Sequence, residues 1–159
     1  MSSEIDNSTE RIAIVRARWH SEIVDSFVAS FAQAWNESAG GATGGIDIFD
    51  VPGALEIPLH AQLVASSGRY AAVVGVAFVV DGGIYRHDFV AGSVLDALVA
   101  VGLRTNTPVL SAVLTPHQFQ DTDVHGEFFR RHFVVKGQEA ASACRGILAE
   151  RRRTAELLA

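Results

Sequence analysis

The residues from Tyr70 to Val80 form an almost unbroken apolar run. A strand of an antiparallel sheet commonly alternates apolar and polar residues, because one of its faces meets water. A strand that helices cover on both faces reads instead as continuous hydrophobic sequence, and such strands are typical of parallel sheets. The run therefore predicts the central strand of an α/β fold.

Strand and helix patterns alternate along the rest of the chain. Further strands are predicted at 11–17, 46–51 and 109–114, and helices at about 22–37, 57–66, 88–105 and 136–158. Parallel strands joined by crossover helices give a three-layer α/β/α sandwich with a four-stranded parallel sheet. The strand-to-helix loops of such a sheet emerge at one edge, where ligands bind.

The composition fits one compact domain. The chain has 159 residues, of which 48% are hydrophobic and 19% are charged, within the usual range for a single domain. We assign residues 11–159 to this domain, and residues 1–10 to a polar arm that is either flexible or exchanged with a neighbouring subunit. The positive mean hydropathy of +0.21 suggests apolar surface buried between subunits, and hence a homo-oligomer.

Charge and cysteine content argue against several classes of protein. A net charge of -5 without a basic stripe gives nucleic acid little to bind. No apolar run reaches the roughly 18–20 residues of a membrane-spanning helix, so no membrane partner is expected. The single cysteine, Cys144, cannot form an internal disulfide, and the polar N-terminus lacks the apolar core of a signal peptide. We therefore expect a cytoplasmic protein.

Two strand-to-helix loops, at 51–58 and 78–87, are the candidate walls of one pocket. In the first loop, Glu56 begins a helix, where its carboxylate either binds a ligand or merely caps the helix. In the second, the Asp81-Gly82-Gly83 turn either cradles a phosphate on its backbone N–H groups or is a simple turn. These alternatives stay open at the level of the local sequence.

Charged and aromatic side chains flank these loops. Arg86 and His87 follow the second loop and are suited to binding phosphate and moving protons. The structural alternative is that Arg86 pairs with Asp88 and that His87 is satisfied at the surface. Trp19 follows the first strand, where its ring either stacks on a planar heterocycle or packs in an interface.

The segment 115–133 is polar, aromatic and rich in histidine, and we predict that it is an active-site flap or an interface loop. His117, His125 and His132 lack the HxxxH or CxxC spacing of common zinc sites, so no metal site is predicted. Neither Ser111 nor Cys144 lies in a nucleophile motif, and covalent catalysis is not indicated.

Together these segments resemble the 6,7-dimethyl-8-ribityllumazine synthases. The likeness covers about residues 11–155 and is carried by the Arg18-Trp19-His20 turn and by the segments 53–58, 79–90, 108–115 and 136–141. The resemblance implies a flavodoxin-like topology. It also implies condensation of 5-amino-6-(D-ribitylamino)uracil with 3,4-dihydroxy-2-butanone 4-phosphate to 6,7-dimethyl-8-ribityllumazine in riboflavin biosynthesis, with no cofactor and no metal.

Motif matching extends the resemblance to single residues. Trp19 matches the aromatic residue that stacks on the pyrimidine. The ribityl side is lined by Ala54, Leu55 and Glu56, the pyrimidine edge by Phe78, Val79 and Val80, and the phosphate-binding turn contains Gly83 and Ile84. Ser111 stands where many members have an aromatic contact, so more of the ring binding falls to Trp19.

The chain departs from the family pattern at its charged residues. Arg86 stands where most members have a proton-transferring histidine, and His87 follows it. Because an arginine stays charged, the expected roles are that Arg86 holds the phosphate or orients the carbonyl group, and that His87 or water moves protons. The usual phosphate-clamping arginine falls near Phe128, and its candidate replacements, from the same or a neighbouring subunit, are Arg130, Arg131 and His132.

These departures resemble the divergent second type of lumazine synthase. That resemblance implies a decamer built from two pentamers, with active sites between adjacent subunits. The alternative function is a flavin- or lumazine-binding protein that has little turnover, because the usual histidine is absent. Product formation from the two substrates separates the two functions.

Overall fold

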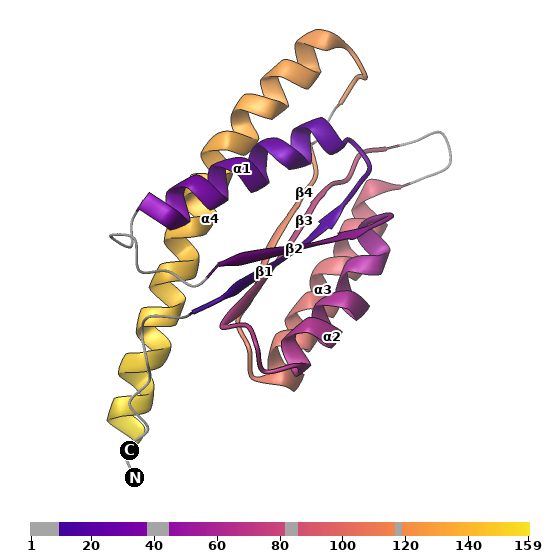
Figure 1. Cartoon of the computed structure of the whole chain (residues 1–159). Coiled ribbons are helices and arrows are strands. Elements are labelled where there is room, and N and C mark those ends of the chain that lie inside the picture. The colour runs from indigo at the N-terminus through magenta and orange to yellow at the C-terminus, as the bar shows by residue number, and fades with distance from the viewer. Residues whose placement is uncertain (1–9, 38–44, 82–85, 117–118) are drawn as a thin grey trace.

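A computed structural model describes residues 10–37, 45–81, 86–116 and 119–159. The parallel sheet that it describes has the strand order β2-β1-β3-β4, and helices lie on both of its faces (Figure 1). The predicted α/β/α sandwich is confirmed. The elements are β1 (Ile12–Ala17), α1 (Ser21–Glu37), β2 (Ile46–Val51), the 3₁₀ turn η1 (Ala54–Glu56), α2 (Ile57–Ser66), β3 (Ala72–Phe78), α3 (His87–Thr105), β4 (Val109–Leu114) and α4 (Asp123–Leu158).

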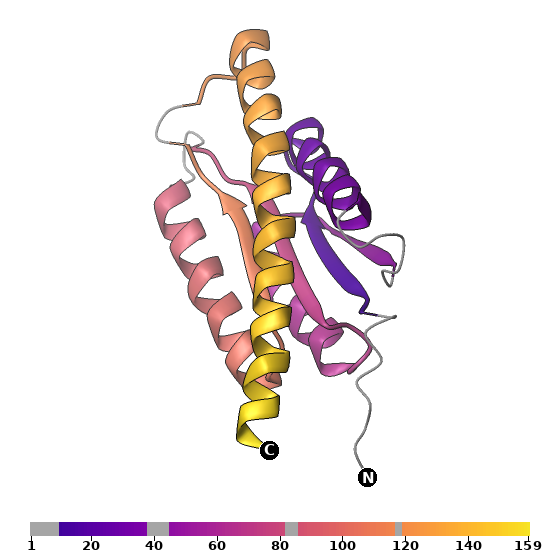
Figure 2. The same cartoon turned by 90° about the vertical axis from the view of Figure 1, so that its left-hand side faces the viewer.

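The sheet separates two hydrophobic cores. Successive residues of a strand point to opposite faces, so Ile12 and Ile14 of β1 pack with α1 and α4, whereas Ala13 and Val15 pack with α2 and α3. Figure 2 shows α4 crossing one face of the sheet beside α1. Every residue of β3 is buried, as its apolar sequence predicts for a strand covered on both sides.

The prediction of a loop through residue 133 is wrong. Helix α4 begins at Asp123, with Thr122 as its N-cap accepting the backbone N–H of His125 at 3.3 Å. Only residues 115–122 connect β4 to this helix, and His117 lies outside the described residues. Phe129 and Phe133, one helical turn apart, place their ring centroids 5.1 and 5.4 Å from that of Phe78. This tertiary packing favours helix in a segment whose histidines and charges suggest a loop.

Helices α1 and α4 pack closely at Gly137. A Cβ atom at this position would lie 2.6 Å from the backbone oxygen of Phe27 and 2.9 Å from the backbone nitrogen of Phe31. The hydroxyl of Ser30 on α1 donates to the carbonyl of Val134, one turn earlier on α4. The absence of a side chain at Gly137 therefore sets how closely the two helices pack.

We predict that Gly137→Ala lowers the free energy of unfolding by about 2 kcal/mol, because the added methyl group meets backbone atoms that cannot rotate away. Gly146→Ala on the same helix is the matched control, since nothing lies within 4 Å of its added Cβ. The control should be neutral or stabilising by up to about 1 kcal/mol through helix propensity. Chemical unfolding at matched protein concentration measures both. Equal stability of the two variants would contradict the packing argument.

Candidate active site

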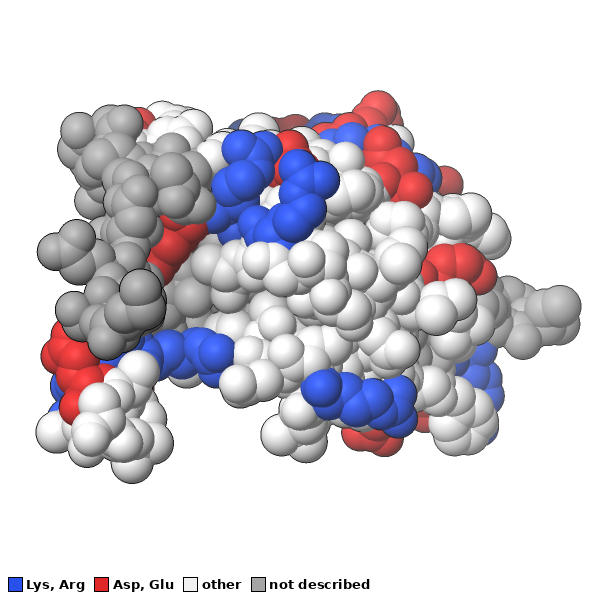
Figure 3. All heavy atoms as spheres, turned by 60° about the horizontal axis from the view of Figure 1, so that its bottom comes forward, with Lys and Arg blue, Asp and Glu red and all other residues white. Residues whose placement is uncertain are grey.

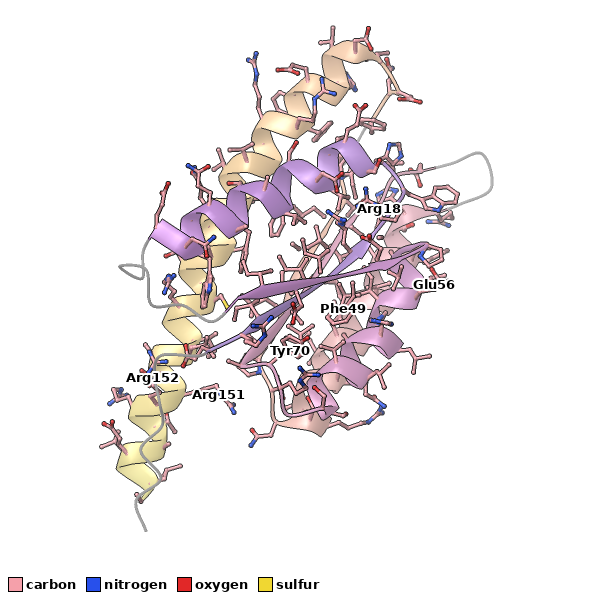
Figure 4. All side chains as sticks on the ribbon, in the orientation of Figure 1. Arg18, Phe49, Glu56, Tyr70, Arg151 and Arg152 are labelled. Atoms are coloured by element: carbon pink, nitrogen blue, oxygen red, sulfur yellow. The ribbon has the colours of Figure 1, made fainter. Side chains whose placement is uncertain are left out.

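A cavity of about 750 Å³ opens at the carboxyl edge of the sheet. Four segments form its walls: the turn after β1, the turn between β2 and α2, the end of β3, and the connector after β4. Figure 4 shows Arg18 and Glu56 near the carboxyl ends of β1 and β2. The cavity is lined by seven of the residues that the sequence assigns to the substrate, namely Trp19, Ala54, Leu55, Glu56, Phe78, Val79 and Val80.

The Glu56 side chain caps the 3₁₀ turn η1, immediately before α2, and also lines the cavity. Its Oε2 accepts the backbone N–H of Gly53 at 2.8 Å, which closes the turn after β2. Pro58 lies in the first turn of α2, where no backbone N–H is needed. The capping contact thus belongs to η1, and the side chain makes no cap hydrogen bond to α2. The Glu56 carboxylate also lies at the cavity wall, where ligand hydroxyls can reach it.

The turn after β1 presents Trp19 to the cavity. The backbone N–H of Arg18 is bonded to the carbonyls of Val51 (3.1 Å) and Pro52 (3.3 Å), which ties this turn to the end of β2. Trp19 follows with 70% of its surface exposed. His20 then adopts a left-handed φ of 53°, a conformation that L-residues other than glycine rarely adopt.

An ion network supports this edge of the sheet. Arg18 donates to both carboxylate oxygens of Asp25, at 2.8 and 3.0 Å, and Arg16 contacts both Asp25 (3.0 Å) and Asp50 (2.7 Å). The hydrogen bond from Arg18 is the main cause that lowers the pKa of Asp25, and the hydrogen bond from Arg16 likewise lowers the pKa of Asp50. Both carboxylates are therefore ionised at neutral pH. They link β1, β2 and α1 beside the cavity.

Asp81 connects the cavity to the start of α3. It lines the cavity, and its Oδ1 accepts the backbone N–H of His87 at 3.0 Å. The same oxygen lies 2.6 Å from Nδ1 of His87. The pKa of the Asp81 carboxyl group is lowered, first by the backbone hydrogen bond and then by the imidazole. His87 is thus held next to the cavity wall.

Arg86 precedes α3 and points to its own helix. Its Nη2 lies 3.1 Å from Oδ2 of Asp88, and its guanidinium lies 4.2 Å from the ring centre of Phe89. Within the single chain, Arg86 therefore pairs with Asp88, as the structural alternative predicts. Gly83 and Ile84 lie outside the described residues.

Arg86 and His87 are not among the residues that line this cavity, and neither are three described residues that the sequence assigns to the substrate, namely Ser111, Arg130 and His132. Ser111, in the edge strand β4, accepts the backbone N–H of Val113 at 3.2 Å. Arg130 on α4 pairs with Glu22 and Glu127, and the ring of His132 lies parallel to that of Phe128 at 6.3 Å. Neither Arg130 nor His132 lines the cavity of its own chain.

Some cavity residues were not assigned from the sequence. Phe119 comes from the connector after β4, and its ring centroid lies 5.2 Å from that of His20 and 5.1 Å from that of Phe78. Asp121 lines the cavity from the same connector. His20 and Asp81 belong to motifs that the sequence singles out, although neither residue is assigned a role of its own there. Phe119 and Asp121 carry no comparable local signal, because tertiary packing brings them here.

Two further classes of feature are absent from the part of the chain that the structure describes. Residues 10–37, 45–81, 86–116 and 119–159 contain no cluster of three or more histidine, cysteine, aspartate or glutamate side chains that could hold a metal ion. No helix within these ranges is long and apolar enough to cross a membrane.

On the face drawn in Figure 3, the basic side chains form separate patches among uncharged atoms.

The fold and the cavity define an α/β sandwich protein that binds a small molecule at the carboxyl edge of its sheet. The sequence profile of the family described as 6,7-dimethyl-8-ribityllumazine synthase matches residues 9–152. The chain belongs to this family, and the resemblance read from the sequence is confirmed.

Curated relatives agree with this assignment. A protein named 6,7-dimethyl-8-ribityllumazine synthase 2 from Bradyrhizobium diazoefficiens is 51% identical over 139 residues, which are 87% of this chain and 82% of the relative. A protein of the same name from Pseudomonas syringae pv. tomato is 52% identical, over 90% of this chain and 84% of its own length. A 6,7-dimethyl-8-ribityllumazine synthase from Rhodococcus erythropolis is 52% identical, over 84% of this chain and 86% of its own length.

Proposed function

We propose that this protein condenses 5-amino-6-(D-ribitylamino)uracil with 3,4-dihydroxy-2-butanone 4-phosphate to 6,7-dimethyl-8-ribityllumazine, as a cytoplasmic enzyme of riboflavin biosynthesis. The observation that carries the proposal is that three motif segments, widely separated in the sequence, line one cavity. Family membership supports the same reaction. The cavity of about 750 Å³ is within the usual size range of small-molecule sites.

The lining matches the parts of a pyrimidine that carries a ribityl chain. The exposed indole of Trp19 offers a flat surface on which a heterocycle stacks. Phe78 and Val79 are buried and give the pyrimidine edge an apolar wall. Glu56 supplies carboxylate oxygens, which accept hydrogen bonds from ribityl hydroxyls.

The phosphate needs groups from beyond this lining. The described lining residues include the carboxylates of Glu56, Asp81 and Asp121 but no lysine or arginine, and carboxylates repel a phosphate. We assign the phosphate to the segment of Gly83 and Ile84, as the family resemblance implies, with Arg86 as the cation that follows it in the sequence. Arg86 and Asp88 are both largely exposed, so their pairing is weak enough to give way to a phosphate.

Arg86 and His87 take different roles in this proposal. Arg86 is permanently charged and therefore holds the phosphate or orients the substrate carbonyl. His87, or water next to it, moves protons during Schiff-base formation and ring closure. A further cation, Arg130 or His132, enters from a neighbouring subunit, because neither side chain lines the cavity of its own chain.

The proposed enzyme is a homo-oligomer, namely a decamer of two pentamers. The outer faces of α2 and α3 expose four large apolar side chains, with 65 to 82% of their surface accessible. These residues are Leu59, Leu63, Val99 and Leu103. In each helix the spacing of four residues puts the pair on one side, and an apolar patch of this kind is typical of a subunit interface.

We predict that the purified protein forms the lumazine product from both substrates through many turnovers, detected by its absorbance and fluorescence. Positioning two reactive molecules supplies much of the rate, even without the usual histidine. Riboflavin binding is titrated in parallel. Stoichiometric flavin or lumazine binding without product formation would reject the synthase function in favour of the binding protein.

Separate substitutions test the roles of Arg86 and His87. Arg86→Ala should raise KM for the phosphorylated substrate about tenfold, because a charge-assisted contact is lost, with a smaller effect on kcat. His87→Ala should lower kcat about tenfold to a hundredfold, because proton transfer is slower. Arg104→Ala, on α3 but bonded to Gln62 away from the cavity, is the control. Wild-type turnover of His87→Ala would remove His87 from the mechanism.

We predict that Val99→Glu converts the oligomer into smaller species, because it places a charge in the apolar patch of α2 and α3. Leu158→Glu, at the exposed end of α4, is the control and should keep the wild-type mass. Sedimentation velocity at several concentrations measures the assembly. An unchanged mass for Val99→Glu would exclude this face from the interface.

A further inference from the structure

One carboxylate oxygen contacts two nitrogen atoms of the same histidine. Oδ1 of Asp81 accepts the backbone N–H of His87 at 3.0 Å and lies 2.6 Å from its Nδ1. The Nδ1 atom is buried, and the contact is close without the alignment of an ideal hydrogen bond. Both the main chain and the ring of His87 are therefore fixed by one residue.

We propose that Asp81 is a positioning residue for His87, holding the imidazole in the tautomer that carries its proton on Nδ1 and leaves Nε2 free to exchange a proton with the substrate. The inference rests on the proposed role of His87 in proton transfer. In this role Asp81 acts on proton transfer through His87. The sequence gives Asp81 no such role.

The chemistry follows from the two nitrogens of a neutral imidazole. One nitrogen carries hydrogen and the other carries a lone pair, and the hydrogen-bond partner of the first decides which is which. A carboxylate accepts hydrogen bonds and cannot donate one when ionised, so Asp81 favours hydrogen on Nδ1. Nε2 then accepts a proton from the substrate and returns it later in the reaction, which leaves His87 unchanged after each turnover.

His87 and its neighbour Arg86 differ in exposure and in their partners. The His87 side chain is 21% exposed and contacts Asp81, which lines the cavity. The Arg86 side chain is 66% exposed and pairs with Asp88. A fixed, half-buried imidazole is better prepared for proton transfer than a side chain that must first leave its partner. The other titratable side chains that line the same cavity are His20, Glu56 and Asp121.

A purely structural alternative is that Asp81 only secures the start of α3. The hydrogen bond to the backbone N–H of His87 does this without any help from the imidazole. Asp81→Asn separates the two roles, because an asparagine oxygen still accepts the backbone N–H but carries no charge to hold the imidazole proton. If the role were structural alone, Asp81→Asn would behave as wild type.

The first test reads the tautomer directly. Full-length protein labelled with ¹⁵N-histidine is sedimented, and the His87 signals, assigned by their loss in His87→Gln, report which nitrogen carries hydrogen. We expect hydrogen on Nδ1 in the wild type and a shift toward the Nε2–H form in Asp81→Asn, at an unchanged melting temperature. Asp88→Asn removes the neighbouring carboxylate and should keep the wild-type signal. An Asp81→Asn spectrum identical to wild type would overturn the proposal.

The second test is a kinetic cycle of Asp81→Asn, His87→Gln and the double variant. Asp81→Asn should lower kcat about tenfold to a hundredfold with KM nearly constant, and it should have little further effect once His87 is replaced. Asp81→Glu, which restores the charge, should recover part of kcat. Equal effects of Asp81→Asn with and without His87 would overturn the proposal.

The two tests separate this inference from the proposed function. The tautomer measurement needs no turnover, so it judges the Asp81–His87 contact even in a protein that only binds flavin or lumazine. If the wild type turns over and His87→Gln keeps full kcat, the proton-transfer role fails and the inference falls with it. If His87→Gln is slow and Asp81→Asn is not, the role of His87 stands and only the inference is overturned.

Discussion

The structure depends on the complete burial of β3 between two helical layers. Because every residue of β3 is buried, the strand must pair on both edges, with β1 on one side and β4 on the other. Parallel pairing brings the carboxyl ends of these strands to one edge of the sheet, and the turns that follow β1 and β3 meet there. The cavity is a consequence of this arrangement. Val79 comes directly after β3, and the turn that carries Trp19 comes directly after β1, so both reach the same edge of the sheet.

Much of the fold could be predicted because the local sequence and the tertiary structure agree. The apolar run at 70–80 contains β3 (Ala72–Phe78) and the segment at 46–51 is β2, since each has a composition that suits its burial. Helix α4 shows where this agreement ends. Its first turns contain polar residues and histidines, and they are held by Phe129 and Phe133 packing on Phe78 from another part of the chain.

The candidate site shows the same division between local and tertiary information. The residues around Trp19 and Glu56 could be assigned because each belongs to a short motif of the family. Phe119 could not, because it reaches the cavity only after the chain has folded its ring against His20 and Phe78. The sequence likewise describes Glu56 as either a cap or a ligand-binding residue, whereas the structure has its carboxylate closing a turn and lining the cavity together.

The charges of the cavity connect the proposed assembly to the proposed chemistry. A phosphate-bearing substrate needs positive charge, yet the described lining residues of one chain contribute Glu56, Asp81 and Asp121 and no lysine or arginine. Arg86 lies immediately before α3, while Arg130 lies on α4 and pairs with Glu22 and Glu127. If a neighbouring subunit brings such an arginine to the cavity, assembly completes the electrostatics of the site. Under this proposal, a variant that dissociates the oligomer loses phosphate affinity before it loses its fold, because the cavity walls themselves come from a single chain.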